Sequence, residues 1–213
     1  MIRFVAFASL AIALLVPPAF GQTTDPASPA PGNPGGMLPG TKQSASSVPA
    51  PRQTNPPDQA FIHSATVGGL AEVELGKLAA QKATGRAVKE FAQQMSRDHS
   101  AANDRLSTIV KAVGIAPPER LDEEHKAMQV RLQQSDGAQF DHSYIQGQII
   151  EHQKTAQLLE YEIGSGENAE LKDFASDLLP TVLGHLRMAQ AIAAEMAQQA
   201  QAEVPPTNRE KRK

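Results

Sequence analysis

Residues 86–113, "RAVKEFAQQMSRDHSAANDRLSTIVKAV", decide the fold of this chain. Apolar side chains recur in this stretch at spacings of three and four residues, which places them on one face of an α-helix. Gly114 follows directly, and prolines at 117 and 118 cannot continue a helix. The stretch therefore predicts a helix that ends at Val113. Its inward face is predicted to consist of Val88, Phe91, Met95, His99, Ala102, Leu106, Ile109 and Val113.

The same periodicity continues on both sides of this helix, and strand-like alternation never persists. Three further long helices are predicted over residues 58–84, 138–163 and 169–202, with a short helix over residues 121–134. Asp58 is the predicted N-cap of the first. Four long helices with short turns after the first and third predict an all-α fold, a ferritin-like antiparallel four-helix bundle with a short extra helix between helices two and three.

Three glycines lie inside the first predicted helix: Gly68, Gly69 and Gly76. Each lowers helix propensity by roughly 1 kcal/mol relative to alanine. We therefore expect each of them to have a packing reason, such as a close approach of the neighbouring helix.

The two ends of the chain differ in composition from the helical part. Residues 1–21 contain Arg3, an apolar run over residues 4–16, and small residues up to Gly21, which predicts a signal peptide cleaved after Gly21. That run is too short for the roughly twenty residues of a transmembrane span. Residues 22–57 are rich in Pro, Gly and Ser and are predicted to form a disordered tether, and residues 204–213 a basic disordered tail. We therefore expect a bundle domain over residues 58–203 and an exported, periplasmic or envelope-associated location.

Charge and composition narrow the classes of function. Residues 58–203 carry 13 Lys and Arg against 21 Asp and Glu, a net charge of −8, which argues against nucleic acid as a partner. The basic tail leaves a cell-envelope protein or surface as a candidate partner. The chain has no cysteine, which excludes disulfides and thiolate metal sites. It also shows no phosphate-binding loop, dinucleotide fingerprint or nucleophile elbow, so no catalytic residue is assigned.

His99 is a polar residue on the otherwise apolar face of the second predicted helix. The same spacing places Glu72, His152 and His185 on the inward faces of the other three long helices. Counted from the turns at about 1.5 Å per residue, the four heights agree within about one helical turn, or 6 Å. The sequence therefore predicts one polar layer in the core, to which each long helix contributes one side chain.

A buried polar layer needs partners, because each unsatisfied group would cost several kcal/mol. One solution is a divalent transition metal, since three imidazoles and a carboxylate suit zinc, copper or iron. Met95 and Met188, each one turn from a histidine, are candidate extra ligands. The other solution is a hydrogen-bonded network that fixes helix register, with Asp98 and Glu151 as candidate acceptors of hydrogen bonds from the outer nitrogens of the histidines. The sequence leaves both open.

Three stretches of the chain resemble a known family: "FIHSATVGGLAEVELGKLAAQKATGRAVKEFAQQMSRDHSAAND", "GQIIEHQKTAQLLE" and "DLLPTVLGHLRMAQ". They look like the ferritin-like domain-of-unknown-function family designated four-one-four-two, whose members are secreted bacterial proteins. The resemblance implies a ferritin-like four-helix fold and brings no established activity. Ser96 and Val182 stand three residues before His99 and His185, where di-iron proteins of this fold have glutamate. This difference argues against an oxidase-type di-iron centre.

Two hypotheses of function follow. The favoured one is an exported, non-catalytic binding or stress-protective module. The alternative is a metal-binding protein that uses Glu72, His99, His152 and His185 in the core of the bundle.

Overall fold

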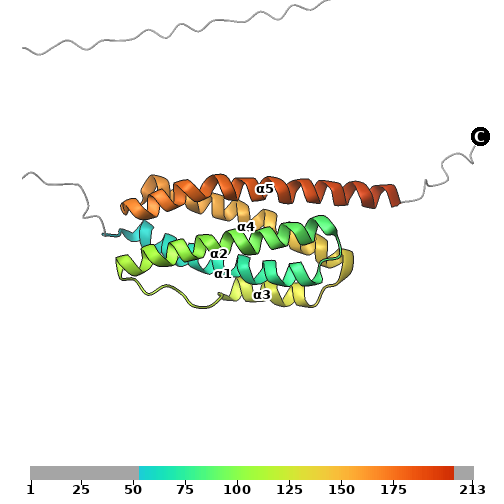
Figure 1. The fold of residues 1–213 in the computed structure, drawn as a ribbon, viewed down its shortest axis with the longest axis horizontal. Helices are drawn as coiled ribbons and strands as arrows, with labels where there is room; N and C mark the ends of the chain where they lie inside the picture. Colours follow the sequence, from blue (N-terminus) through green and yellow to red (C-terminus); the bar gives the residue numbers. More distant parts are fainter. Residues whose placement is uncertain (1–52, 204–213) are drawn as a thin grey trace, which may run out of the picture. The chain divides into compact units, whose positions relative to one another are not determined.

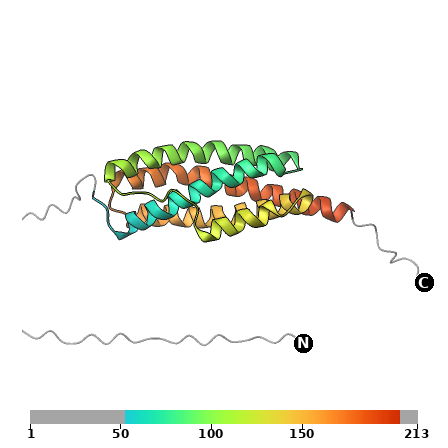
Figure 2. The same ribbon diagram turned by 90° about the horizontal axis from the view of Figure 1, so that it is seen from below.

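The computed structural model describes residues 53–203, which form five α-helices and no strand. The helices are α1 (Pro56–Lys82), α2 (Arg86–Val113), α3 (Glu123–Gln133), α4 (Gly137–Ser165) and α5 (Ala169–Glu203). The predicted all-α class is confirmed. Helix α1 packs mainly against α2, and α4 against α5, with further contacts of α1 with α4 and of α2 with α5 (Figure 1). The short helix α3 lies against α1 and α4, as Figure 2 shows from below.

The predicted signal peptide, the tether up to residue 52 and the basic tail lie outside the described residues. Within residues 53–203, no helix combines the length and the apolar character that a membrane span requires.

Helix α1 begins earlier than the sequence pattern predicts. Asn55 is its N-cap, and its side chain accepts a hydrogen bond from the backbone N–H of Asp58 (2.9 Å). The Asp58 carboxylate accepts one in return from the Asn55 N–H (2.6 Å), which completes a capping box. The prediction of Asp58 as the cap was therefore wrong by three residues. Pro56 and Pro57 are the first two residues of the helix. Their missing N–H groups cost nothing there, because the first N–H groups of a helix have no partner within it. The end of the predicted tether therefore belongs to the folded domain.

The core consists of two apolar clusters separated along the helices. One contains Phe91, Met95, Phe140, Tyr144 and Ala189, among others. The other contains Phe61, Leu106, Leu159, Phe174 and Val182, among others. On each of α2, α4 and α5, a histidine stands between the residues of one cluster and those of the other. These histidines form the polar layer described below.

The glycines of α1 differ in what surrounds them. A Cβ at Gly76 would lie 3.0 Å from the backbone oxygen of Ala92 and 3.2 Å from the backbone nitrogen of Ser96. A Cβ at Gly69 would collide with Oδ1 of Asn103. These two glycines therefore permit the close approach of α2. Gly68 does not follow the expectation, because a Cβ there would meet nothing within 4 Å.

We expect Gly76→Ala to destabilise the domain. The added methyl group presses on the backbone of α2, and such overpacking typically costs 1–3 kcal/mol, more than the roughly 1 kcal/mol gained in helix propensity. Gly68→Ala is the matched control, and it should raise the free energy of unfolding by up to about 1 kcal/mol because only the propensity gain applies. Urea denaturation of both variants measures this. An equal gain in both would show that α1 and α2 do not depend on Gly76 for their approach.

Candidate metal centre

Three buried histidines from three helices face one another in the core. His99 lies on α2, His152 on α4 and His185 on α5, with exposed fractions of 6, 1 and 2 %. The centroids of their rings are 5.4–5.6 Å apart in all three pairs. Each offers a ring nitrogen, and these three nitrogens lie within 4.8 Å of one another. The structure thus brings together all three histidines that the sequence assigns to the polar layer.

Hydrogen bonds on the outer side fix the orientation of two of these rings. Nδ1 of His152 lies 2.9 Å from the backbone oxygen of Gln148 and donates its proton to it. Nε2 of His185 lies 2.9 Å from Oδ2 of Asp98 and donates to that carboxylate. Each donation leaves the other ring nitrogen as a bare acceptor. The free lone pairs are therefore on Nε2 of His152 and Nδ1 of His185.

The inner nitrogens have no hydrogen-bond partner in the described structure. This is true of Nε2 of His99, Nε2 of His152 and Nδ1 of His185, all of which are buried. Because an unpaired buried polar atom costs free energy, three at one place call for an explanation. The atoms left without a partner are one from each ring, which is the arrangement that a shared ligand would satisfy.

The electrostatic environment keeps these imidazoles neutral. Burial, with a smaller effect of the neighbouring rings of His152 and His185, lowers the pKa of His99 to about 3. Burial also lowers the pKa of His152 and that of His185, although the hydrogen bond to Asp98 partly opposes the shift for His185. Neutral imidazole is the form that binds metals, so no proton needs to leave before an ion binds.

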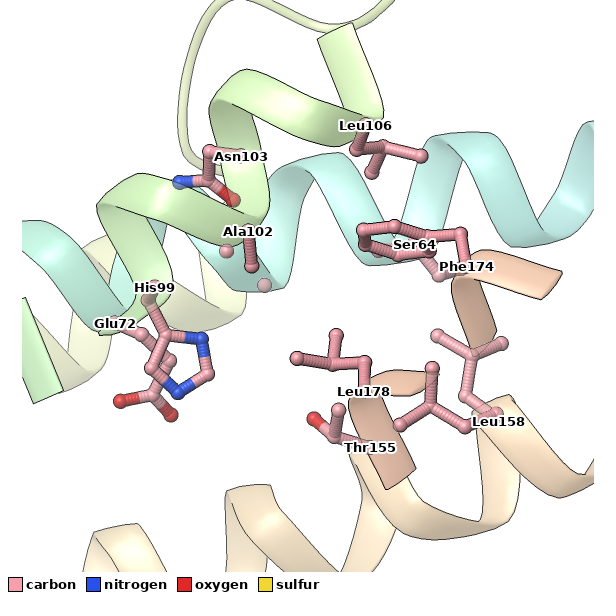
Figure 3. Close-up of a pocket in the computed structure, with 14 residues that line it drawn as sticks. Ser64, Glu72, His99, Ala102, Asn103, Leu106, Thr155, Leu158, Phe174 and Leu178 are labelled. Atoms are coloured by element: carbon pink, nitrogen blue, oxygen red, sulfur yellow. The ribbon is translucent and has the colours of Figure 1, made fainter. Parts of the chain in front are cut away.

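Glu72 lies beside the histidines, outside the group of three. Its Oε1 is 3.9 Å from Nδ1 of His152, the nitrogen that faces away from the free lone pair. Its Oε2 is buried without a hydrogen-bond partner. Burial raises the pKa of Glu72 to about 7, against a hydrogen bond from Gln148 that lowers it. Glu72 and His99 both line a small cavity of about 40 Å³, in which Figure 3 shows their side chains at one end.

The other predicted residues have different surroundings. Met95 is fully buried in the apolar cluster of Phe91 and Tyr144, and Met188 packs against the same cluster. Asp98 contacts a site histidine, His185, as the sequence suggests. Glu151 accepts a hydrogen bond from Lys154 (3.0 Å) and pairs with Nε2 of His125 (3.5 Å).

Two participants escaped the sequence analysis. The Gln148 carbonyl that orients His152 is a backbone group, so no residue type announces it. His125, to which the sequence analysis gave no partner, lies at the start of α3, is only 8 % exposed, and has its Nδ1 2.7 Å from Oδ1 of Asp122. Hydrogen bonds to Glu151 and Asp122 raise the pKa of His125 to about 9 against the effect of burial. The spacing of Asp122 and His125 as N-cap and third residue of α3 is the one signal that pointed to this contact.

A comparison with known protein families identifies the family of this chain. The family model "Domain of unknown function (DUF4142)" matches residues 43–192, which is well over half of the sequence. The chain belongs to the DUF4142 family. The match begins in the segment predicted as tether and includes all four residues of the predicted polar layer.

Solved structures resemble this DUF4142 chain at low sequence identity. A DUF305 fragment from Deinococcus radiodurans is 15% identical with a TM-score of 0.60, over 67% of this chain and 98% of that one. A structure described as CopM in the Ag-bound form is 20% identical with a TM-score of 0.48, over 70% of this chain and 98% of that one. The first likeness supports the helical fold of the DUF4142 domain and no more. No curated protein matches the chain.

Proposed function

We propose that this domain binds one divalent transition metal ion through His99, His152 and His185. The observation that supports the proposal most strongly is the set of three inner ring nitrogens that no protein group satisfies. They come from three helices, and one ring nitrogen of each histidine lies within 4.8 Å of one from each of the other two. Burial lowers the pKa of all three rings, which are therefore neutral.

The chemistry of the ligand set favours zinc or copper. A metal bound 2.0–2.1 Å from each imidazole nitrogen in a tetrahedron places those nitrogens about 3.3 Å apart, so a small inward rotation of the rings completes the site. Three imidazoles leave a fourth position for water or a further ligand. The hydrogen bonds from His152 to a backbone carbonyl and from His185 to Asp98 are the outer contacts that metal-binding histidines commonly make.

A purely structural network is the competing explanation, and it accounts for less of the geometry. It explains the outer hydrogen bonds, of which that of His152 lies within α4 and that of His185 joins α5 to Asp98 on α2. It does not explain the inner nitrogens, because a network that fixes helix register gains its free energy from satisfied groups. A metal satisfies all three inner atoms at once.

The proposed biological role is that of an exported metal-holding module on a ferritin-like four-helix bundle. The packing of the four long helices supports the bundle. The signal-peptide pattern of residues 1–21 supports export. The absence of a glutamate three residues before His99 and His185 supports a single-ion holding site in place of di-iron catalysis.

Equilibrium titration with Zn²⁺ and with Cu²⁺ tests the proposal. The metal-free protein should bind one ion per chain and show a higher melting temperature with each, since a ligand specific to the native state stabilises it by about 2.7 kcal/mol at a hundredfold excess over Kd. Copper should bind more tightly than zinc at a nitrogen site. A protein that binds neither ion, with an unchanged melting temperature, would contradict the proposal.

Asp98→Asn should weaken metal binding by about 10- to 100-fold, because the carboxylate fixes the tautomer and orientation of His185. Asp104→Asn on the same helix is the control, since Asp104 is exposed. The ratio of the two Kd values, measured by competition with a chelator, gives the effect. Equal Kd values would show that the Asp98–His185 hydrogen bond does not support a bound ion.

A further inference from the structure

We propose that the metal ion reaches the three histidines through a passage between α1 and α4 that is open because residue 68 is glycine. This inference rests on the proposed function, and it names the route by which the site is filled. A site enclosed between two apolar clusters needs such a route, because its histidines are between 1 and 6 % exposed.

Two cavities lie in series along this route. The inner one, of about 40 Å³, is lined by Glu72 and His99 at one end, and the rest of its lining is mostly apolar, with Ser64, Asn103 and Thr155 as the polar side chains. Its volume exceeds the 10–15 Å³ that one water needs. The outer one, of about 400 Å³, opens to the surface and is lined by His63, Asp122, Glu124, His125, Glu151 and Lys154, among others.

The same four residues line both cavities: Ser64 and Gly68 on α1, and Thr155 and Leu158 on α4. The two cavities therefore adjoin at these residues. Three of them, Ser64, Thr155 and Leu158, stand around the inner cavity in Figure 3. Gly68 is the one of the four that has no side chain.

Gly68 is the glycine of α1 that helix packing does not explain. A Cβ there would meet nothing within 4 Å, whereas one at Gly69 or Gly76 would press on α2. Because glycine lowers helix propensity, alanine would stabilise this position, yet glycine is present. A passage accounts for it: a side chain at residue 68 would project into space that both cavities share.

Charged groups mark the route on both sides of Gly68. In the outer cavity three carboxylates, of Asp122, Glu124 and Glu151, face two cations, Lys154 and the protonated His125. The outer cavity therefore carries one net negative charge, which favours the entry of a cation. Its carboxylates can pair with the incoming ion in place of Lys154 or His125. On the inner side, Glu72 lies one turn after Gly68 and lines the inner cavity together with His99. Its Oε2 has no hydrogen-bond partner.

The test measures the rate of metal uptake separately from the affinity. Apo protein of full length is mixed with Co²⁺ in a stopped-flow instrument, and the visible absorbance of the bound ion is followed. Gly68→Leu should slow association at least about tenfold, which corresponds to only about 1.4 kcal/mol of added barrier. It should slow dissociation equally and leave Kd unchanged, because a blocked route alters both directions alike. Gly164→Leu is the control, since Gly164 is exposed and also has nothing within 4 Å of its Cβ position.

The possible results distinguish a failure of the proposed function from a failure of the passage. Wild-type protein that binds no Co²⁺, Zn²⁺ or Cu²⁺ overturns the proposed function and the passage with it. Wild-type protein that binds, with Gly68→Leu equally fast, overturns the passage and leaves the function standing. A changed Kd with an unchanged association rate also overturns the passage, because residue 68 then acts on the site itself. Should Gly68→Leu fail to fold, Gly68→Ala replaces it, and a rate equal to wild type counts against the proposal.

Discussion

His152→Ala should abolish the rise in melting temperature that added metal produces. The substitution removes one of three ligand nitrogens, so binding should weaken by well over the roughly 10- to 100-fold that the loss of an outer partner costs. The metal-free variant should also be less stable than wild type by about 1–3 kcal/mol, because the substitution removes a buried side chain together with its hydrogen bond to the Gln148 carbonyl.

The design separates a ligand from a structural histidine. His142→Ala is the control, because His142 is an exposed histidine on the same helix. Thermal melts of both variants and of wild type are compared with chelator, with Zn²⁺ and with Cu²⁺. If His152→Ala lowers stability while metal shifts wild type and variant alike, His152 is only a packing and hydrogen-bonding residue.

The second large effect concerns pH and lies at the other end of the domain. Glu162 on α4 is fully buried, and neither of its carboxyl oxygens receives a hydrogen bond. Burial raises its pKa to about 8, and a hydrogen bond to Asp58 contributes to the shift. Asp58 is itself fully buried and accepts hydrogen bonds from the backbone N–H groups of Asn55, Glu167 and Asn168. A protonated Glu162 that donates to the Asp58 carboxylate satisfies both groups.

The sign of the pH effect follows from the direction of this shift. The folded-state pKa of about 8 lies above the unfolded value of about 4.5, so the native state holds the proton more tightly. The stabilisation is complete below pH 4.5, declines by up to about 1.4 kcal/mol per pH unit as pH rises, and is lost above pH 8.

Glu162→Gln should remove this dependence, since the amide can still donate to Asp58 but does not ionise. Relative to wild type the variant should gain several kcal/mol in the free energy of unfolding between pH 5 and pH 8.5, the window set by the shift. Urea denaturation at a series of pH values measures the difference. Glu160→Gln, at an exposed position on the same helix, is the control. Parallel curves for wild type and Glu162→Gln would show that Glu162 is ionised in the native state.

Much of the fold could be predicted because one physical signal dominates it. Apolar spacing on four long segments indicated the helices, and glycines and prolines indicated their ends. The start of α1 was misplaced because Asp58, which is the third residue of the helix and closes the capping box, resembles an N-cap in sequence. The true cap, Asn55, precedes two prolines and is recognised only from the reciprocal hydrogen bonds.

The candidate site was predictable in its members and less so in its geometry. Helical spacing placed three histidines and Glu72 in one layer, but spacing does not give the direction of a ring. The structure brings one ring nitrogen of each histidine within 4.8 Å of the others and places Glu72 beside Nδ1 of His152. The orienting carbonyl of Gln148 and the cavity behind Gly68 depend on packing between helices that are distant in sequence.

The most direct test of the central claim is X-ray absorption spectroscopy of the protein loaded with one equivalent of Zn²⁺. The spectrum should show three imidazole nitrogens at about 2.0–2.1 Å, with the outer-ring scattering that identifies histidine and one oxygen ligand, such as water, in the fourth position. The His152→Ala protein under the same conditions should lose this signature. Zinc that is surrounded only by oxygen ligands, or that washes off wild type during preparation, would contradict the assignment of His99, His152 and His185 as a metal centre.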